Sequence, residues 1–202
     1  MRNYNLTLDQ TIELDLPVKL YAAAIADALA IIHWAVNVDA YDIEFVLGSE
    51  GDVTYTRDIS QVLNLTLEQI STMETYTDLE ALMMVNFPQR TTRLWVLDFN
   101  PCNTWKEETA WKHPEVLVNQ LVVSFFENDP YYPLPPMDID VDKDLWEIFS
   151  TKYLERASQI LEAPGKDERL ANLPRKFVDA CIERERRNLA SKLGHGHRQF
   201  KD

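Results

Sequence analysis

The stretch LWVLDFNPC, from Leu94 to Cys102, decides how the rest of this chain is interpreted. Four apolar residues run into Asp98 and Phe99, and turn-forming residues follow at once. This pattern is typical of a short buried strand that ends at an acidic side chain. Asp98 is therefore either a metal ligand at the end of a strand or only the residue that ends it, since Asp disfavours strand continuation.

Length and composition predict one domain, or one domain with an arm. The chain has 202 residues, of which 46% are hydrophobic and 26% charged, as in an ordinary globular protein. No apolar run is long enough to span a membrane, and no signal pattern opens the chain. Cys102 and Cys181 are the two cysteines, so we expect no disulfide framework and a reducing compartment, cytoplasmic or nuclear.

The net charge of −13 is unevenly distributed along the chain. Residues 174–202 carry eight Lys and Arg against four Asp and Glu, whereas the other 173 residues carry 12 against 29. An acidic body does not attract phosphates, so nucleic acid is not expected as a partner. The basic segment docks on the acidic body, binds a partner, or forms a solvated helix face, as charged runs usually do.

Hydrophobic periodicity predicts several helices and a few short strands. Asp15 and Pro17 are expected as the N-cap and first turn of a helix that ends near His33 and Trp34. Further helices are expected over 65–86, 143–161 and 174–193, and another is expected to begin at Pro114. Strands are expected over 44–47 and 93–97, with a hairpin arm over 52–56. We expect the tryptophans at 34, 95, 105, 111 and 146 in the core. These proportions predict a helix-rich α+β fold, with a body over 1–173 and a basic helical arm and tail over 174–202.

The order of elements around the two expected strands resembles a known arrangement. The first strand lies within VDAYDIEFVLG, from Val38 to Gly48, after the part of this segment that holds Asp39, and the second ends in LDFN. This order resembles the C-terminal lobe of protein kinases and of related small-molecule phosphotransferases. The resemblance implies that Asp39 is the catalytic base, and that Asp98 and Glu44 hold magnesium on the phosphates of ATP.

The chain departs from the kinase pattern at several positions. Asn37 and Val38 stand where protein kinases have His and Arg, Glu44 replaces an Asn, and Asn100 replaces a Gly. About sixteen residues precede the first expected helix, so most of an N-terminal lobe, with its Gly-rich loop and Lys, has no place there. The chain is therefore either part of a longer gene product or a lobe that works without nucleotide chemistry.

Several longer segments resemble one protein family more closely. These segments are ALAIIHWAVNVDAYDIEFVLGS, LWVLDFNPC, NDPYYP and DLWEIFSTKYLERAS. Together they are similar to a fungal family whose members are labelled "zinc finger protein" or as a domain of unknown function. The resemblance runs from Arg2 to the helix that holds Phe177, and it implies an intracellular protein with more sequence before this point. It implies no activity.

Each of these candidate residues has a structural role as the alternative to its functional one. A zinc site is not expected, because it needs four closely spaced Cys or His ligands and Cys102 and Cys181 are isolated. In this alternative, Asp39 caps a turn, Glu44 points outward from its strand, and Asp98 only ends the strand that precedes it. His33, at a helix end, is expected to be packed or to act as a cap.

Two functions therefore remain open at the level of sequence. We favour a non-catalytic kinase-like module that binds another protein or a ligand, because the N-terminal lobe and several catalytic positions are missing. The alternative is a magnesium-dependent small-molecule phosphotransferase that needs the missing lobe from a longer chain or a partner. A protein partner or self-association is expected at the face that the absent lobe leaves bare, and no membrane contact is expected.

Overall fold

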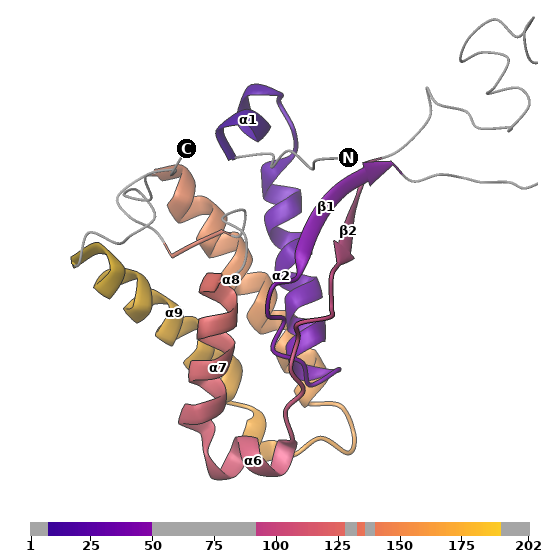
Figure 1. Ribbon diagram of the computed structural model, residues 1–202, viewed down its shortest axis with the longest axis vertical. Coiled ribbons are helices and arrows are strands. Elements are labelled where there is room, and N and C mark those ends of the chain that lie inside the picture. The colour runs from indigo at the N-terminus through magenta and orange to yellow at the C-terminus, as the bar shows by residue number, and fades with distance from the viewer. Residues whose placement is uncertain (1–7, 50–91, 128–132, 136–139, 191–202) are drawn as a thin grey trace, which may run out of the picture. The chain divides into compact units, whose positions relative to one another are not determined.

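The computed structural model describes residues 8–49, 92–127, 133–135 and 140–190 (Figure 1). These residues form the helices α1 (Leu8–Glu13), α2 (Val18–Trp34), α6 (Glu107–Lys112), α7 (Pro114–Glu127), α8 (Asp140–Leu161) and α9 (Leu173–Ala190), a 3-10 turn (Glu168–Leu170), and the strands β1 (Glu44–Ser49) and β2 (Thr92–Leu97). The chain divides into two compact units, Met1–Phe45 with Val96–Asp202, and Val46–Trp95. The expected helix-rich α+β class is confirmed, whereas the likeness to a kinase lobe stays a prediction.

The turn between α1 and α2 corrects the expected start of the second helix. Asp15 has a left-handed backbone with φ 52°. Its N–H donates to the carbonyl of Ile12 (3.0 Å), and the N–H of Leu16 donates to that of Thr11 (3.0 Å). This pair of bonds is the Schellman motif that ends a helix. Asp15 therefore ends α1, and Pro17 occupies the N-cap position of α2 without a side-chain cap.

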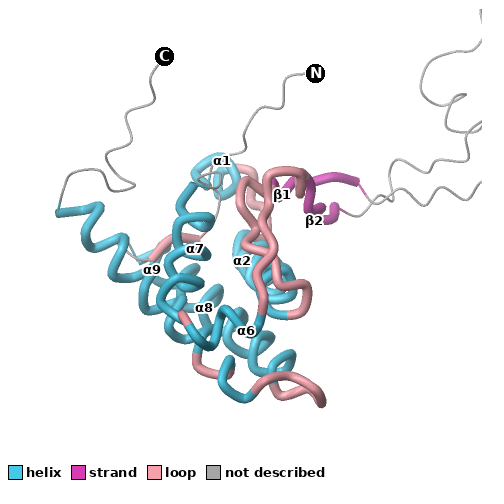
Figure 2. The backbone as a smooth tube through the Cα atoms, turned by 60° about the horizontal axis from the view of Figure 1, so that its bottom comes forward, coloured by secondary structure: helices cyan, strands magenta, loops and turns pink. Residues whose placement is uncertain are grey.

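The larger unit is built around α2. This helix packs along α8, while α9 packs against α7 and α8 (Figures 1 and 2). Buried positions of α2 recur three and four residues apart, which places them on a broad face towards its neighbours. They are Ala22, Ile25, Ala26, Leu29, Ala30, Ile32, His33 and Trp34.

Aromatic rings join α7, α8 and α9 in the core. Phe149 stacks on Trp146 with a centroid distance of 5.4 Å, and on Tyr153 at 6.1 Å. Phe177 of α9 lies 5.2 Å from Tyr153 and 5.8 Å from Phe125 of α7. Stacked and edge-to-face pairs of this kind stabilise a core beyond the apolar area they bury. The segment that begins at 174 thus contributes to the same core as the rest of this unit.

Helices α7 and α9 each bury one face and expose the other. On α7, Val118, Leu121, Val122 and Phe125 point inward, since all are 9% exposed or less. On α9 the buried residues include Phe177, Val178 and Cys181. The basic residues of α9 lie on its exposed side; they are Arg175, Lys176, Arg184, Arg186 and Arg187.

The two strands pair with one another in a two-stranded sheet (Figure 1). In the smaller unit, Gly48 lies against Trp95: a Cβ added at Gly48 would come within 2.7 Å of Cδ1 of the indole. Trp95 is 48% exposed, so its expected place in the core is wrong. The reason is that its ring covers a glycine of the neighbouring strand, whereas Trp34, Trp105 and Trp146 are buried among helices.

Other expectations from the sequence are resolved only in part. The expected helix over 65–86 and the hairpin arm over 52–56 lie outside the described residues. The short helices α1 and α6 were not expected. None of the helices that the structure describes is long and apolar enough to cross a membrane.

Candidate functional site

The loop between α2 and β1 carries the predicted catalytic base. Three of its residues have a left-handed backbone: Asn37 (φ 61°), Ala40 (φ 57°) and Asp42 (φ 59°). Residues other than glycine rarely adopt this conformation, and Asn and Asp adopt it most easily. An antiparallel bridge between Val38 and Thr104 holds the loop against the segment that follows β2. Such a conformation persists where the surrounding contacts impose it.

Asp39 is at the centre of these contacts. Its side chain is buried, with the residue 2% exposed. Oδ1 accepts hydrogen bonds from the backbone N–H groups of Asn103 (2.8 Å) and Tyr41 (3.1 Å). Oδ2 accepts from the side-chain amides of Asn103 (3.1 Å) and Gln120 (2.8 Å). We call these residues the Asp39 cage; it ties the loop to the segment after β2 and to α7.

The cage keeps Asp39 ionised. Burial by itself would raise the pKa of this carboxyl, but the hydrogen bonds from Gln120, Asn103 and Tyr41 outweigh it and lower the pKa. Donors that face a carboxylate stabilise its charged form. A carboxylate with a lowered pKa takes up a proton weakly, and its lone pairs already face donors. The geometry therefore gives Asp39 the properties of a structural anchor.

His33 belongs to a second buried network beside the cage. The hydroxyl of Tyr153 accepts from Nε1 of Trp34 (2.8 Å) and lies 2.8 Å from Nδ1 of His33. The hydrogen bond to the backbone of Asp39 favours the charged ring, so the other ring nitrogen carries the proton there, and Nδ1 accepts from the Tyr153 hydroxyl. The proton of His33 is then on Nε2, and the ring is hydrogen-bonded to the backbone of Asp39.

Both titratable members of this network are neutral at ordinary pH. Burial lowers the pKa of His33 from 6.5 to about 3, and the charge of Asp39 and the hydrogen bond to its backbone oppose this only in part. Burial also raises the pKa of Tyr153 well above its usual range. His33 is thus a packed residue, one of the two structural roles expected for it, and it offers no proton for chemistry near pH 7.

The other predicted site residues lie next to the two strands. Asp98 follows β2, is exposed and has φ 58°, while Glu44 begins β1 and is half-buried. Burial raises the pKa of the Cys102 thiol, and the charges of Asp39, Asp98 and Asp42 raise it further. The structure thus brings Asp39 and Asp98 to the neighbourhood of one thiol, which is a poor nucleophile because its thiolate is disfavoured.

The described residues do not form a metal centre. Among them, no group of three or more His, Cys, Asp or Glu lies close enough to hold a metal ion. Asp39, Glu44 and Asp98 are all described and are not gathered into such a group. The magnesium role of Asp98 and Glu44 stays a prediction. A structural zinc site needs four ligands, and none is formed in this part of the chain. His195 and His197 lie outside the described residues.

The partners of Asp39 were missed in the sequence. Asn103 and Gln120 lie 64 and 81 residues further along the chain. Neither residue forms a sequence motif with Asp39. Asn and Gln occur this far from an Asp in most sequences, so their presence does not indicate a contact. The left-handed Asn37 and Asp42 were the available hint, since short polar side chains around an acid are typical of a tight, hydrogen-bonded loop.

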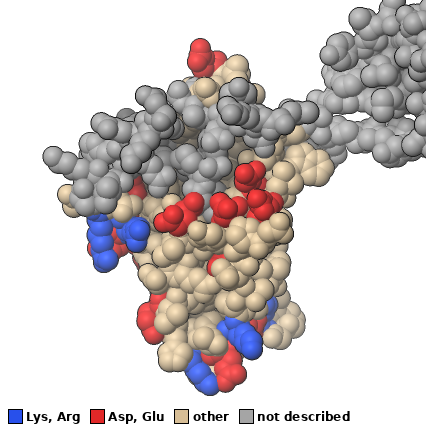
Figure 3. Space-filling model, viewed as in Figure 1, with Lys and Arg blue, Asp and Glu red and all other residues tan. Residues whose placement is uncertain are grey.

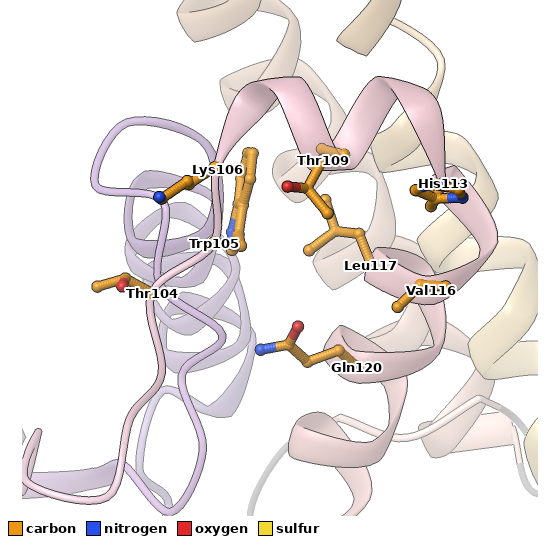
Figure 4. Close-up of a pocket in the computed structure, with 9 residues that line it drawn as sticks. Thr104, Trp105, Lys106, Thr109, His113, Val116, Leu117 and Gln120 are labelled. Atoms are coloured by element: carbon orange, nitrogen blue, oxygen red, sulfur yellow. The ribbon is translucent and has the colours of Figure 1, made fainter.

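A groove adjoins the Asp39 cage, between the segment 104–106 and the helices α6 and α7 (Figure 4). Its volume is about 220 Å³. Trp105 and Leu117 lie on opposite sides of it, and Gln120 lies at one end (Figure 4). The complete lining is Thr104, Trp105, Lys106, Thr109, Ala110, His113, Val116, Leu117 and Gln120. This groove was not expected from the sequence, because it is formed by segments that come together only in the fold.

Comparison with known proteins identifies one family model in the chain. The model of a family of domains of unknown function, described as "Zinc finger protein", matches residues 94–165. The match begins in β2 and ends after α8, so it contains Asn103, Gln120 and the whole groove. No curated protein and no solved structure matches the chain.

Proposed function

We propose that this chain is a non-catalytic binding module whose partner is another protein. The observation that carries the proposal is the Asp39 cage. The residue that the kinase-like order assigns as catalytic base is 2% exposed and accepts four hydrogen bonds. A base must reach a substrate proton within hydrogen-bonding distance, and a buried carboxylate surrounded by donors does not offer that access.

The groove also supports a binding role over nucleotide chemistry. Pockets for cofactors and drug-sized ligands enclose about 300–1,000 Å³. The groove beside the cage holds about 220 Å³, which suits one side chain or a short segment better than a nucleotide.

Exposed apolar side chains near Asp98 are consistent with a protein partner. Leu97 and Phe99 flank Asp98 in sequence and are 46% and 51% exposed. Exposed aromatic and aliphatic side chains that lie close together are common where proteins meet. These two side chains therefore support a protein partner.

A thermal-unfolding titration tests the non-catalytic part of the proposal. The full chain is titrated with ATP and with magnesium, separately and together. A ligand that binds only the folded state raises the midpoint with its concentration. We expect no joint shift in the wild type and none in Asp98→Asn.

The phosphotransferase alternative predicts the opposite result. There Asp39 is the base, Asp98 and Glu44 hold magnesium, and ATP and magnesium together stabilise the fold. A joint shift that is lost in Asp98→Asn, or ATP hydrolysis that the same variant abolishes, would replace our proposal with the alternative.

A further inference from the structure

The segment 103–105, which borders the groove, pairs with the loop 37–39 through one antiparallel bridge and leaves its other edge open. Asp39 N–H donates to the carbonyl of Asn103 (2.9 Å), and Trp105 N–H donates to that of Asn37 (2.9 Å). In an antiparallel pair, backbone groups of successive residues point to opposite sides. The N–H and C=O of Thr104 therefore point away from the loop, and within the described part of the chain they have no backbone partner. Thr104 lines the groove.

One basic side chain at this edge is left without an acidic partner. Glu107 is engaged by Lys166 (2.9 Å), and Glu108 is engaged by Lys112 (2.5 Å). Both glutamates follow Lys106 within two residues, yet Lys106 makes no ion pair with any residue that the structure describes. The lining of the groove includes Lys106 and no Asp or Glu, although the chain has a net charge of −13. On the face that Figure 3 shows, several acidic side chains lie close together on the described surface.

The floor of the groove is apolar and carries one oriented acceptor. Leu117 is 4% exposed and Trp105 is 9% exposed. Gln120 donates its amide N–H to the carboxylate of Asp39, which only accepts, so its carbonyl oxygen is turned the other way. Figure 4 shows that oxygen directed into the groove. The groove thus provides an apolar surface, an acceptor and a cation next to an open strand edge.

We propose that this groove binds an extended peptide segment of a protein partner, in which an acidic side chain lies next to an apolar one. The peptide backbone pairs with the N–H and C=O of Thr104, as in β-strand addition. The apolar side chain packs between Trp105 and Leu117, and the carboxylate reaches Lys106. This inference rests on the proposed binding function and specifies its surface and the chemistry of its partner.

A selection from a random heptapeptide library displayed on phage, against the full chain, tests the proposal. Selected peptides are synthesised, and their dissociation constants are measured for the wild type and three variants. Lys106→Glu reverses the charge at the groove. Thr109→Trp fills the groove from an exposed position on α6. Lys176→Glu is the matched control, because it makes the same charge change on the exposed side of α9.

We expect the selected peptides to contain Asp or Glu beside an apolar residue. Their affinity should fall about tenfold or more in Lys106→Glu, since an attraction becomes a repulsion, and should change little in Lys176→Glu. Thr109→Trp should weaken binding while the thermal midpoint stays near that of the wild type. Replacing the acidic residue of the peptide by its amide should reproduce the loss.

Two results would overturn the groove as the site. One is the absence of enriched peptides; the other is a set of peptides that bind Lys106→Glu as tightly as wild type, or that contain no acidic residue. Peptides that bind elsewhere on the chain would exclude the groove but leave the proposed binding function intact. Stabilisation of the folded chain by ATP with magnesium would instead overturn the binding function itself. If the chain instead pairs with its own copy at this groove, Thr109→Trp abolishes a dimer seen by light scattering, and the proposed partner is excluded.

Discussion

Asp39 shows how one acidic side chain acquires its role from its surroundings. In the kinase-like order it stands where a catalytic base would, but it accepts hydrogen bonds from Asn103, Tyr41 and Gln120. Hydrogen bonds to a charged group contribute about 1.5–3 kcal/mol each, and a buried donor that loses its acceptor costs about 1–3 kcal/mol. The balance of these terms makes Asp39 a residue that stabilises the fold.

Replacing Asp39 by Asn should lower the free energy of unfolding by about 2–4 kcal/mol. The amide N–H₂ of Asn would face the donors of Asn103 and Gln120, so at least one donor loses its acceptor. Denaturant unfolding measures the change. The matched control is Asp98→Asn, an exposed position with φ 58° that Asn tolerates, for which we expect a change within about 0.5 kcal/mol. Equal effects of the two substitutions would show that the cage does not stabilise the protein.

His33 makes the stability of the fold depend on pH. Its pKa is about 3 in the folded chain and 6.5 in the unfolded chain, so the unfolded chain binds the extra proton between these values. Stability is therefore complete above pH 6.5 and is lost as the pH falls, by about 1.4 kcal/mol per unit. Between pH 7 and pH 5 this group should remove about 2 kcal/mol. Asp39 remains ionised in both states over that window, because its ordinary pKa of 3.8 is lowered further.

The measurement is denaturant unfolding of the wild type and of His33→Gln across this range of pH. Gln can accept from Tyr153 but does not titrate, so the variant should be less stable at pH 7 and should lose most of the slope. A variant with the same slope as the wild type would assign the pH dependence to other groups.

At the level of elements, the turn at Asp15 decides where two helices meet. Its left-handed backbone completes the Schellman motif of α1, and glycine adopts this conformation without a steric cost. We expect Asp15→Gly to be more stable than Asp15→Ala by about 1 kcal/mol, since Ala meets the full cost of positive φ. Thermal or denaturant unfolding of the two variants gives the difference. If Ala were the more stable of the two, residue 15 would have a helical backbone and begin α2 instead.

The elements differ in how well local sequence predicts them. Helices α2 and α7 follow a hydrophobic pattern of 3.6-residue period, so the end of α2 near Trp34 and the start of α7 at Pro114 were predicted. Helix α6 has one buried residue, Ala110, and so has no such pattern. The N-cap of α2 was misplaced because Asp15 is equally suited to a cap and to a left-handed turn.

At the level of the whole molecule, α9 is part of the core of the larger unit. Phe177 is fully buried and contacts Tyr153 and Phe125, and Cys181 is fully buried too. Removing α9 would expose these apolar surfaces, at a cost of about 1.5–3 kcal/mol for each large side chain, which approaches the whole stability of a domain. The basic residues of this segment therefore do not make it a separable arm.

Two truncated chains test this. A chain that ends at residue 172 lacks α9 and should lose cooperative unfolding, with the near-ultraviolet circular dichroism of its aromatic core reduced. A chain that ends at residue 190 keeps α9 and should unfold with a midpoint close to that of the full chain. Cooperative unfolding of the shorter chain would mean that residues 8–172 fold without α9.

The sequence by itself determined the helical faces, the positions of the two strands and the helix-rich class, because hydrophobic periodicity is a local property of the chain. It also pointed to Asp39 as a residue of consequence. The tertiary structure alone decided what Asp39 does, since its partners Asn103 and Gln120 lie 64 and 81 residues away, and the Tyr153 partner of His33 lies 120 residues away. Burial and these distant hydrogen bonds set the protonation and access of each group, and no local pattern contains that information.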